Sequence, residues 1–364
     1  MVRISDRKES HISISIEEDV QSRYKTTGFE DVHFIHRALP NISLEEVDVS
    51  TRIFGHKISA PILIESITGG TEKTRDINAS LAEAAETLKL AMGVGSQRAA
   101  LENPSLEYTF RVVREKAPNI FLIANLGAPQ LVKGYGKKEA KQAVDMIDAD
   151  ALFIHLNPLQ EIIQPEGETD YRGVHRKIEE IVNAVDVPVI VKETGAGIAY
   201  EEAVLLEKIG VNGIDVAGSG GTSWAAVEYF RAKKMKNKLR ESLGRTFWDW
   251  GIPTASSIVE VHLSTKNMKI FGSGGIRNGL EVAKSIALGA DMAGFAMPVL
   301  KPVIKGTKKA QEALKAFIEE LRVAMFLTGC KTIEDLKSSP IIITGKISEW
   351  LKSRGFNPEL YRRK

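Results

Sequence analysis

Short apolar runs recur along the chain, and each is followed by glycine or polar residues and then by a segment with a helical pattern. The eight runs cover residues 60–66, 89–95, 119–127, 150–157, 187–193, 213–220, 268–275 and 291–298. Most are continuously apolar rather than alternating, as expected of parallel strands that are covered on both faces. The pattern therefore predicts eight buried strands.

The segments between these runs are amphipathic. Residues 71–90 place apolar side chains on one face of a helix, and residues 176–185, 199–210 and 279–290 repeat this spacing. Eight strand and helix alternations predict an α/β fold, a parallel (β/α)8 barrel of the TIM-barrel kind. An open doubly wound sheet is the alternative, because a count of strands does not show that the sheet closes.

The order of these elements predicts three parts. Residues 1–59 form an N-terminal extension that packs beside the barrel or over its mouth and contributes to the active site. Residues 60–306 form the barrel, with an insertion at 224–267 after the sixth strand, and residues 307–364 form a helical tail. The basic stretch at 231–240 is either a solvated helix face or part of a lid, because loops after barrel strands lie at the catalytic end.

Composition narrows the class of protein. The chain has 364 residues, of which 43% are hydrophobic, and a formal charge of +2 that argues for no nucleic-acid partner. The single cysteine, Cys330, excludes an internal disulfide and suits a reducing cytoplasm. Residues 1–19 lack the apolar core of a signal peptide, and no run approaches the ~20 residues of a membrane helix. We therefore expect a cytoplasmic protein without a membrane segment.

The stretch FGSGGIRNG at 271–279 follows the seventh run and begins a helix. Glycines let backbone N–H groups approach an anion, the helix start supplies further donors, and Arg277 adds a forked charge. Phosphates often bind in the loops after barrel strands seven and eight, and the second loop here is GFAMP at 294–298. A tight turn with a surface arginine is the alternative, but this position favours a phosphate site. Its place late in the chain argues against a dinucleotide-binding turn.

Polar residues also end the other predicted strands. A lysine at the end of a buried strand, Lys192, needs an anionic partner, such as the ring of a reduced flavin near its N1 atom. The alternative is a partly exposed lysine at the mouth of the strand. Any one polar group could be a cap, but their coincidence predicts a ligand site at one end of the barrel. The clusters are 66–70, 95–98, Asn125, 155–157, Lys192 and 218–222.

Longer motifs carry a family resemblance. These are RKESHI at 7–12, SITGGT at 66–71, GSQRAALE at 95–102, NLGAPQL at 125–131, HLNPLQEIIQPEGE at 155–168, VKETGAGI at 191–198, DVAGSGGTSWAAVE at 215–228 and the stretch at 271–298. With them the chain resembles the type 2 isopentenyl-diphosphate delta-isomerases. HLNPLQE with GSQR is specific to that family, whereas GSGGIR is shared by many FMN-dependent barrels. The resemblance covers residues 7 to about 300, and the last ~60 residues carry no such motif.

The resemblance implies a (β/α)8 flavoenzyme that interconverts isopentenyl and dimethylallyl diphosphate, using reduced FMN and Mg²⁺ without net redox change. NADPH is the implied reductant, and a homo-oligomer, tetramer or octamer, is implied as the assembly. Implied FMN contacts are Ser66, Thr68, Gly69, Ser96, Asn125, Lys192, Thr222, Gly274, Gly275, Arg277, Ala296 and Met297. Implied substrate contacts are Arg7, Lys8, Ser96, Gln97, Arg98, His155, Asn157 and Gln160.

Three of these implied roles concern the chemistry. Glu161 would hold Mg²⁺ with phosphate oxygens and water, although a solvated loop acid is the alternative. Gln160 and Lys192 would be catalytic, with Gln160 near the allylic carbons. Arg7 and Lys8 would close over the diphosphate.

Other flavin and barrel enzymes are the competing hypotheses. An FMN-dependent 2-hydroxy-acid oxidase would need a histidine base followed closely by an arginine, but residues 255–270 offer only His262, with no arginine before Arg277. A nucleotide dehydrogenase would need a cysteine in the strand-six loop, and Cys330 lies far from it. A flavin-binding protein without activity is the third possibility, which a turnover assay would distinguish.

Overall fold

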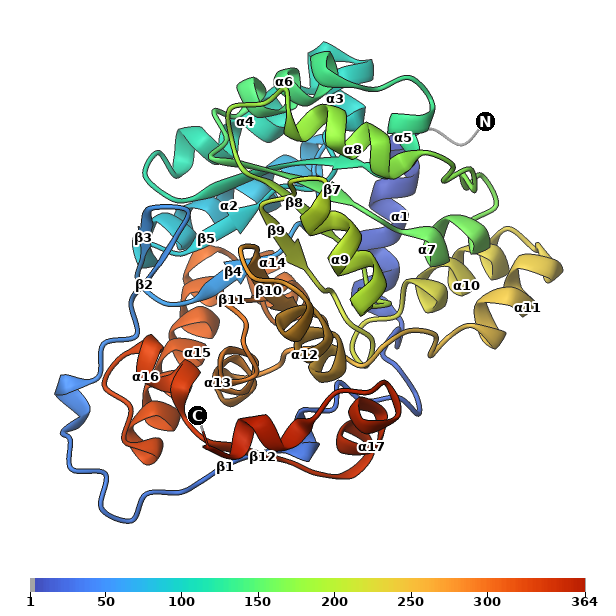
Figure 1. Cartoon of the computed structure of the whole chain (residues 1–364). Coiled ribbons are helices and arrows are strands. Elements are labelled where there is room, and N and C mark those ends of the chain that lie inside the picture. The colour runs from blue at the N-terminus through green and yellow to red at the C-terminus, as the bar shows by residue number, and fades with distance from the viewer. Residues whose placement is uncertain (1–3, 364) are drawn as a thin grey trace.

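The eight predicted runs form the strands of a closed parallel barrel in the computed structural model, which describes residues 4–363 (Figure 1). In chain order the strands are β4 (Ile62–Ile64), β5 (Ala91–Gly93), β6 (Leu122–Gly127), β7 (Ala151–His155), β8 (Val189–Lys192), β9 (Gly213–Asp215), β10 (Lys269–Ser273) and β11 (Met292–Phe295). Each pairs with its neighbour in sequence, and β11 pairs with β4 to close the cylinder. The barrel prediction is confirmed, and the open-sheet alternative is wrong.

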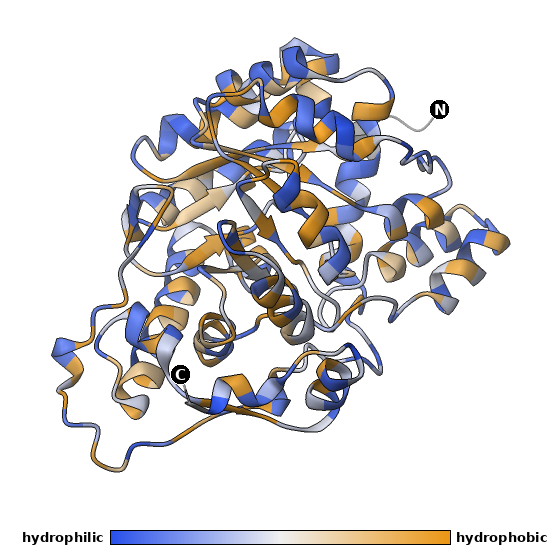
Figure 2. Ribbon diagram, in the orientation of Figure 1, coloured by the Kyte–Doolittle hydropathy of each residue, from blue (hydrophilic) through white to orange (hydrophobic). Residues whose placement is uncertain are grey.

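One helix follows each strand on the outside of the barrel (Figure 1). These are α2 (Glu72–Leu88), α4 (Tyr108–Lys116), α6 (Lys137–Met146), α8 (Val174–Val182), α9 (Tyr200–Lys208), α12 (Thr254–Ser264), α13 (Gly279–Ala287) and α15 (Thr307–Thr328). In α2, the Thr71 hydroxyl accepts a hydrogen bond from the N–H of Thr74, and Ile77 and Leu81 are buried. Figure 2 shows hydrophobic residues along the strands and both kinds of residue on the helices. Among residues 4–363, no helix has both the length and the apolar character needed to cross a bilayer.

Further short helices lie mostly where the strands end. They are α3 (Arg98–Glu102), α5 (Ala128–Val132), α7 (Pro158–Ile163), α10 (Trp224–Lys234), α11 (Lys238–Thr246) and α14 (Met297–Ile304). The predicted insertion at 224–267 contains α10, α11 and α12. Because α12 packs on α9 and β10 as the barrel's own helix, the added chain is the pair α10 and α11, which packs on α7.

The N-terminal extension and the C-terminal tail wrap the barrel from outside. Residues 1–3 of the extension and Lys364 of the tail lie outside the described residues. Helix α1 (Ile4–Glu17) packs on α10, whereas β1 (Val32–Phe34) pairs with β12 (Ile341–Ile343) of the tail (Figure 1). The tail also contains α16 (Ile333–Ser338), which packs on α13, and α17 (Gly345–Ser353), which packs on α12.

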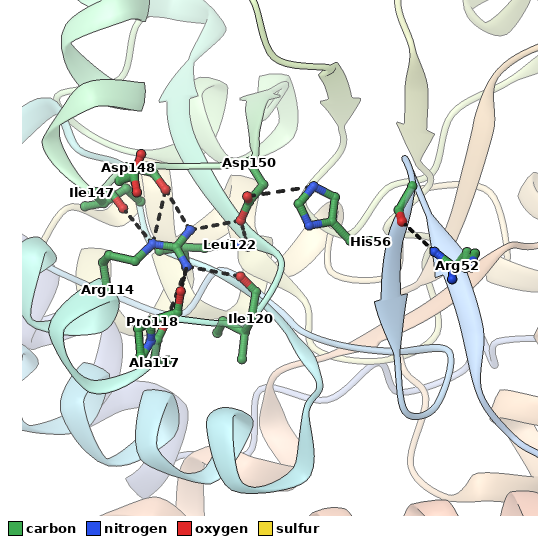
Figure 3. Close-up of polar contacts among 11 residues, drawn as sticks. Arg52, His56, Arg114, Ala117, Pro118, Ile120, Leu122, Ile147, Asp148 and Asp150 are labelled. Carbon is green, nitrogen blue, oxygen red and sulfur yellow. Dashed lines mark hydrogen bonds and ion pairs between the residues drawn. The ribbon is translucent and has the colours of Figure 1, made fainter.

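A hairpin, β2 (Thr51–Ile53) and β3 (His56–Ile58), covers the amino-terminal end of the barrel and packs apolar side chains against its interior. Beside it, the Arg114 guanidinium donates to the Asp150 carboxylate at 2.9 Å, and His56 Nε2 lies 3.8 Å from the other oxygen of Asp150 (Figure 3). Arg114 also donates to the backbone carbonyls of Ala117, Pro118, Ile120, Ile147 and Asp148. Arg114 therefore connects several loops at this end of the barrel.

Candidate functional site

A cavity of about 290 Å³ opens at the carboxyl ends of the barrel strands, under α1. Most of the predicted site residues line it. These are Arg7, Lys8, Ser66, Thr68, Ser96, Arg98, Asn125, His155, Asn157, Gln160, Glu161, Lys192, Thr222, Gly274, Gly275, Arg277, Ala296 and Met297. The strand ends that the sequence indicated thus meet in one place.

Two predicted contacts, Gln97 and Gly69, lie behind the cavity wall instead. The Gln97 side chain is fully buried, donates to the Ala143 carbonyl at 2.8 Å and accepts from the N–H of Asn125 at 2.8 Å. Gly69 offers its carbonyl oxygen to the Lys8 ammonium. Both residues hold neighbours in position, and the structure does not bring the Gln97 side chain into the cavity.

The glycine loop after β10 fits against the loop after β9. Gly274 and Gly275 have φ values of +101° and +76°, and a Cβ on Gly274 would lie 2.2 Å from the carbonyl oxygen of Gly218. Arg277 follows, with its guanidinium donating to Gln21 of the N-terminal extension at 2.7 Å. Burial lowers the Arg277 pKa, yet an arginine keeps its charge. At this end of the cavity the backbones of two loops therefore lie against each other, beside an arginine whose position is fixed by a hydrogen bond.

The floor of the cavity carries a buried ionic group. Lys192 Nζ lies 3.6 Å from both Glu65 Oε2 and Asp215 Oδ2, and it donates to the Glu193 carbonyl at 2.8 Å. Burial opposes the charge, but Asp215, Glu65 and Glu193 outweigh it and raise the Lys192 pKa. Lys192 is therefore an ammonium inside the molecule, and acidic side chains of the protein lie beside it where the sequence suggested a flavin ring as the partner.

The buried hydroxyl group of Ser66, a half-buried residue, tests whether FMN fits this cavity. The Ser66 hydroxyl lies in the lining and has no hydrogen-bond partner among the described residues. A buried unpaired hydroxyl is costly, so a polar ligand group is expected against it. With the Arg277 end and the Lys192 ammonium, the cavity offers donors for a phosphate-bearing, electron-rich ring. These residues fit FMN.

The opposite rim gathers cations from separate parts of the chain. Arg7 and Lys8 come from α1, and Arg98 begins α3. The Lys8 ammonium donates to the Ser96 carbonyl at 2.8 Å, and burial, followed by repulsion from Arg7, lowers its pKa to about 7. Burial also lowers the Arg7 pKa. Crowded, partly desolvated cations of this kind favour a multiply charged anion.

Beside these cations, His155 ends β7, with Nδ1 lying 2.7 Å from Asn125 Oδ1. Burial, helped by the Lys192 charge, lowers the His155 pKa to about 3, so its imidazole is neutral near pH 7. It adds a polar group to this rim without adding charge.

Helix α7 carries the amide and the acid of the HLNPLQE motif. Pro158 fits the first helical position, and Asn157 precedes it. The Asn157 amide donates to Gln160 Oε1 at 3.1 Å and to Glu161 Oε1 at 3.0 Å. The N–H of Glu168 donates to Glu161 Oε2 at 2.6 Å. Gln160 and Glu161 are thus held at fixed positions on the cavity wall.

Sequence reasoning missed the acid behind Gln160. Glu228 on α10 is fully buried, and its Oε1 accepts from Gln160 Nε2 at 3.3 Å and lies 2.8 Å from His11 Nε2. Its other oxygen accepts from Arg231 at 2.6 Å. Burial alone would raise the Glu228 pKa, but His11 and Arg231 lower it overall. The DVAGSGGTSWAAVE motif ends on this residue and was the signal that could have indicated it.

Glu161 is the one predicted metal ligand. Among residues 4–363, no group of three or more histidine, cysteine or acidic side chains could hold a metal ion. A site for Mg²⁺ would therefore depend on this single carboxylate with ligand oxygens and water, a mode that suits this cation.

The chain is similar to proteins of one enzyme family over nearly its full length. A family model described as FMN-dependent dehydrogenase matches residues 2–105 and 167–343. A Methanosarcina mazei protein named isopentenyl-diphosphate delta-isomerase is 50% identical over 353 residues, covering 97% of this chain and 96% of its own. The protein of that name from Methanothermobacter thermautotrophicus is 50% identical over 361 residues, covering 99% of each chain.

Solved structures share the architecture at low identity. A Pediococcus acidilactici lactate oxidase superposes with a TM-score of 0.67 at 17% identity, covering 93% of this chain and 94% of that one. A flavocytochrome b2 variant gives a TM-score of 0.68 at 18% identity, covering 97% of this chain and 87% of that one. At such identities these structures show the fold alone.

Proposed function

We propose that this chain, which belongs to the FMN-dependent dehydrogenase family and within it to the isopentenyl-diphosphate delta-isomerases, interconverts isopentenyl diphosphate and dimethylallyl diphosphate. The observation that carries the proposal is a single cavity with two cationic ends. Arg277 lies at one end, and Arg7, Lys8 and Arg98 lie at the other. A cofactor phosphate would bind at the first of these ends and a substrate diphosphate at the second.

FMN is the cofactor whose phosphate fits the Arg277 end. The backbone at Gly274 and Gly275, the Ser66 hydroxyl and the Lys192 ammonium supply the remaining contacts. Reduced FMN supplies an electron-rich ring that can hold or pass a proton and can stabilise positive charge on a neighbouring alkene.

The chain's own residues orient the substrate. Arg7, Lys8 and Arg98 bind the diphosphate, which fixes the position of the isoprenoid carbons. The Gln160 amide is held at both ends, by Asn157 and by Glu228, which supports a role in which it faces those carbons in one orientation. A glutamine is a weak base, so it orients or relays a proton and does not act alone. Helix α1 covers the cavity and excludes water.

Several finer features belong to the same proposal. Glu161 binds Mg²⁺ together with diphosphate oxygens. NADPH reduces the flavin, the protein assembles as a homo-oligomer, a tetramer or an octamer, and it acts in the cytoplasm. Support for these last three is the family resemblance and, for the location, the lone Cys330.

An anaerobic assay tests the function. Purified protein is incubated with FMN, a reductant, Mg²⁺ and isopentenyl diphosphate, and dimethylallyl diphosphate is measured. Product is expected with reduced FMN and not with oxidised FMN, and Arg98→Met should raise KM because it removes a diphosphate contact. Protein that binds reduced FMN and forms no allylic product would overturn the proposal.

The same preparation tests the oxidase alternative. His262, the histidine that a 2-hydroxy-acid oxidase would use, lies on α12, and its ring packs near Tyr361, 6.4 Å away, and not in the cavity lining. Lactate or mandelate in air should therefore yield no hydrogen peroxide. Peroxide formation at a rate comparable to isomerisation would favour the oxidase.

A further inference from the structure

The charges of Lys192, Glu65 and Asp215 on the cavity floor do not balance. Glu65 directly follows β4, Lys192 ends β8, and Asp215 ends β9, in register with Lys192. Each carboxylate lies 3.6 Å from the same ammonium nitrogen, and all three residues are buried. If both acids were ionised, the group would hold two negative charges against one positive charge, with little water to solvate the excess.

No other described residue supplies the missing charge. Glu193 is itself an acid, and its carboxylate accepts from the N–H groups of Thr194 and Gly195 at 2.6 Å each. His155 lies opposite Lys192 in the backbone register of β7 and β8, but burial lowers its pKa to about 3 and leaves it neutral. The remaining polar neighbours of the group, Ser66 and Ser273, are uncharged.

Two acceptor atoms in this group also lack donors. Glu65 Oε1 and Asp215 Oδ2 are buried and have no hydrogen-bond partner among the described residues. A single proton held between the two carboxyl groups would supply a donor and remove the excess negative charge.

We propose that Glu65 carries this proton and shares it with Asp215, so that Glu65 is a positioning residue that leaves the Lys192 ammonium as the charge facing the cavity. Hydrogen bonds assign the proton to Glu65. Asp215 Oδ1 already accepts from the Ser273 hydroxyl at 2.5 Å and from the N–H of Ala217 at 3.3 Å, which stabilise a carboxylate. Apart from the Lys192 ammonium at 3.6 Å, the one donor to the Glu65 carboxyl among residues 4–363 is the N–H of Ser66, at 3.3 Å.

Two further observations agree with this assignment. Burial, then the Asp215 charge, raises the Glu65 pKa to about 8. The chain also makes room for the carboxyl group, because a Cβ on Gly294 of β11 would lie 2.1 Å from Glu65 Oε1. Lys192 and Glu65 line the cavity, whereas Asp215 does not, so a ligand over the floor meets an ammonium and a neutral acid.

Infrared spectroscopy of the full chain without cofactor tests the protonation directly. The carbonyl stretch of a buried carboxylic acid is expected near pH 7, shifted in D₂O and lost as the pH rises through about 8. Burial also raises the pKa of Glu193 to about 7, so this acid contributes a second band that is lost at lower pH. Glu65→Gln should remove the component that is lost near pH 8. Glu193→Gln is the matched control and should keep that component. Absence of the component from the parent protein, or its survival in Glu65→Gln, would overturn the inference.

A redox titration of the FMN-bound protein tests the consequence. Asp215→Asn removes a negative charge and should move the flavin midpoint potential to a more positive value. Glu65→Gln replaces a neutral acid by a neutral amide and should leave that potential close to the parent value. An equal positive shift in both variants would overturn the inference. This second test rests on the proposed FMN site, whereas the infrared test does not, so a failure of FMN binding is distinguishable from a failure of the proton assignment. If Asp215→Asn does not fold, the infrared comparison still decides.

Discussion

Lys8 shows how burial prepares a side chain for an anion. With a pKa of about 7, most Lys8 side chains are neutral at pH 8 in the ligand-free protein. A diphosphate beside Nζ favours the charged form, so substrate binding at pH 8 should take up about one proton at this residue. Calorimetric titration in two buffers with different heats of ionisation measures this uptake.

Lys8→Arg is the matched variant for that measurement. Arginine is charged throughout this pH range, so the uptake should fall by about one proton while binding is retained. Equal uptake by the two proteins would assign the proton to another group, and no uptake by the parent would show that Lys8 is already charged.

Glu228 is the residue at which the position of Gln160 is best tested. Glu228→Gln keeps the size of the side chain but weakens its bonds to Gln160, His11 and Arg231. We expect kcat to fall about 10–100-fold, with the affinity for FMN little changed, because charge-assisted hydrogen bonds are worth about 1.5–3 kcal/mol. Glu241→Gln, which affects an acid of α11 with partners on the surface, should keep kcat. A change in KM with kcat unchanged would contradict the proposed role.

Single residues were predictable where a motif joined them to a strand end. Arg277 and Lys192 follow continuous apolar runs, so their place at the barrel mouth could be inferred from the sequence. Glu65 could not be inferred, because an acid next to a strand is ordinary in sequence, and the one signal for Glu228 was its place at the end of the DVAGSGGTSWAAVE motif. Only the folded chain brings Glu65 to Lys192 and Glu228 to Gln160.

Helix α1 connects element packing to substrate binding. Ile14 is fully buried against Val20, Val227 and Trp248, and the same helix carries Arg7 and Lys8. Ile14→Ala should weaken this packing by about 2–4 kcal/mol. We expect α1 to detach without unfolding the barrel, and therefore a rise in KM of at least about tenfold with a small change in Tm. Kinetics and hydrogen exchange of residues 7–17 measure the effect.

The control for that variant lies on a neighbouring helix. Leu239 of α11 is 69% exposed, and Leu239→Ala should change neither KM nor the exchange of α1. A fall in Tm without a change in KM for Ile14→Ala would show that α1 does not separate from the barrel on its own.

Most elements were predictable because strands covered on both faces are continuous apolar runs. The sequence was less informative after β9. The run at 213–220 contains only three strand residues, and α12 was included in the insertion. Residues 254–261 are buried throughout, so the sequence there lacks the one-sided period of a surface helix. Closure of the barrel depends on the pairing of β11 with β4, which no local pattern encodes.

At the scale of the molecule, chemistry and stability occupy opposite ends of the barrel. Arg114→Met removes the guanidinium from several carbonyls and from Asp150 (Figure 3). We expect it to lower the free energy of unfolding by about 3 kcal/mol while the affinity for FMN and KM stay unchanged. Thermal unfolding and steady-state kinetics test this separation.

Arg111→Met is the comparison within the same helix. Arg111 is 56% exposed, and within residues 4–363 its ion pair is with Glu107, so this variant should cost less than about 1 kcal/mol. Equal destabilisation by the two variants would show that the carbonyl contacts of Arg114 contribute little.

The pairing of β1 with β12 has a consequence for synthesis of the chain. Phe34 pairs with Ile341, and at about 5–20 residues per second a ribosome needs roughly 15–60 s to add the residues between them. Strand β1 must therefore wait for the whole barrel and most of the tail helices to be made before β12 is available to pair with it. A nascent chain stalled just before residue 341 would contain every strand of the barrel, but β1 would have no partner strand.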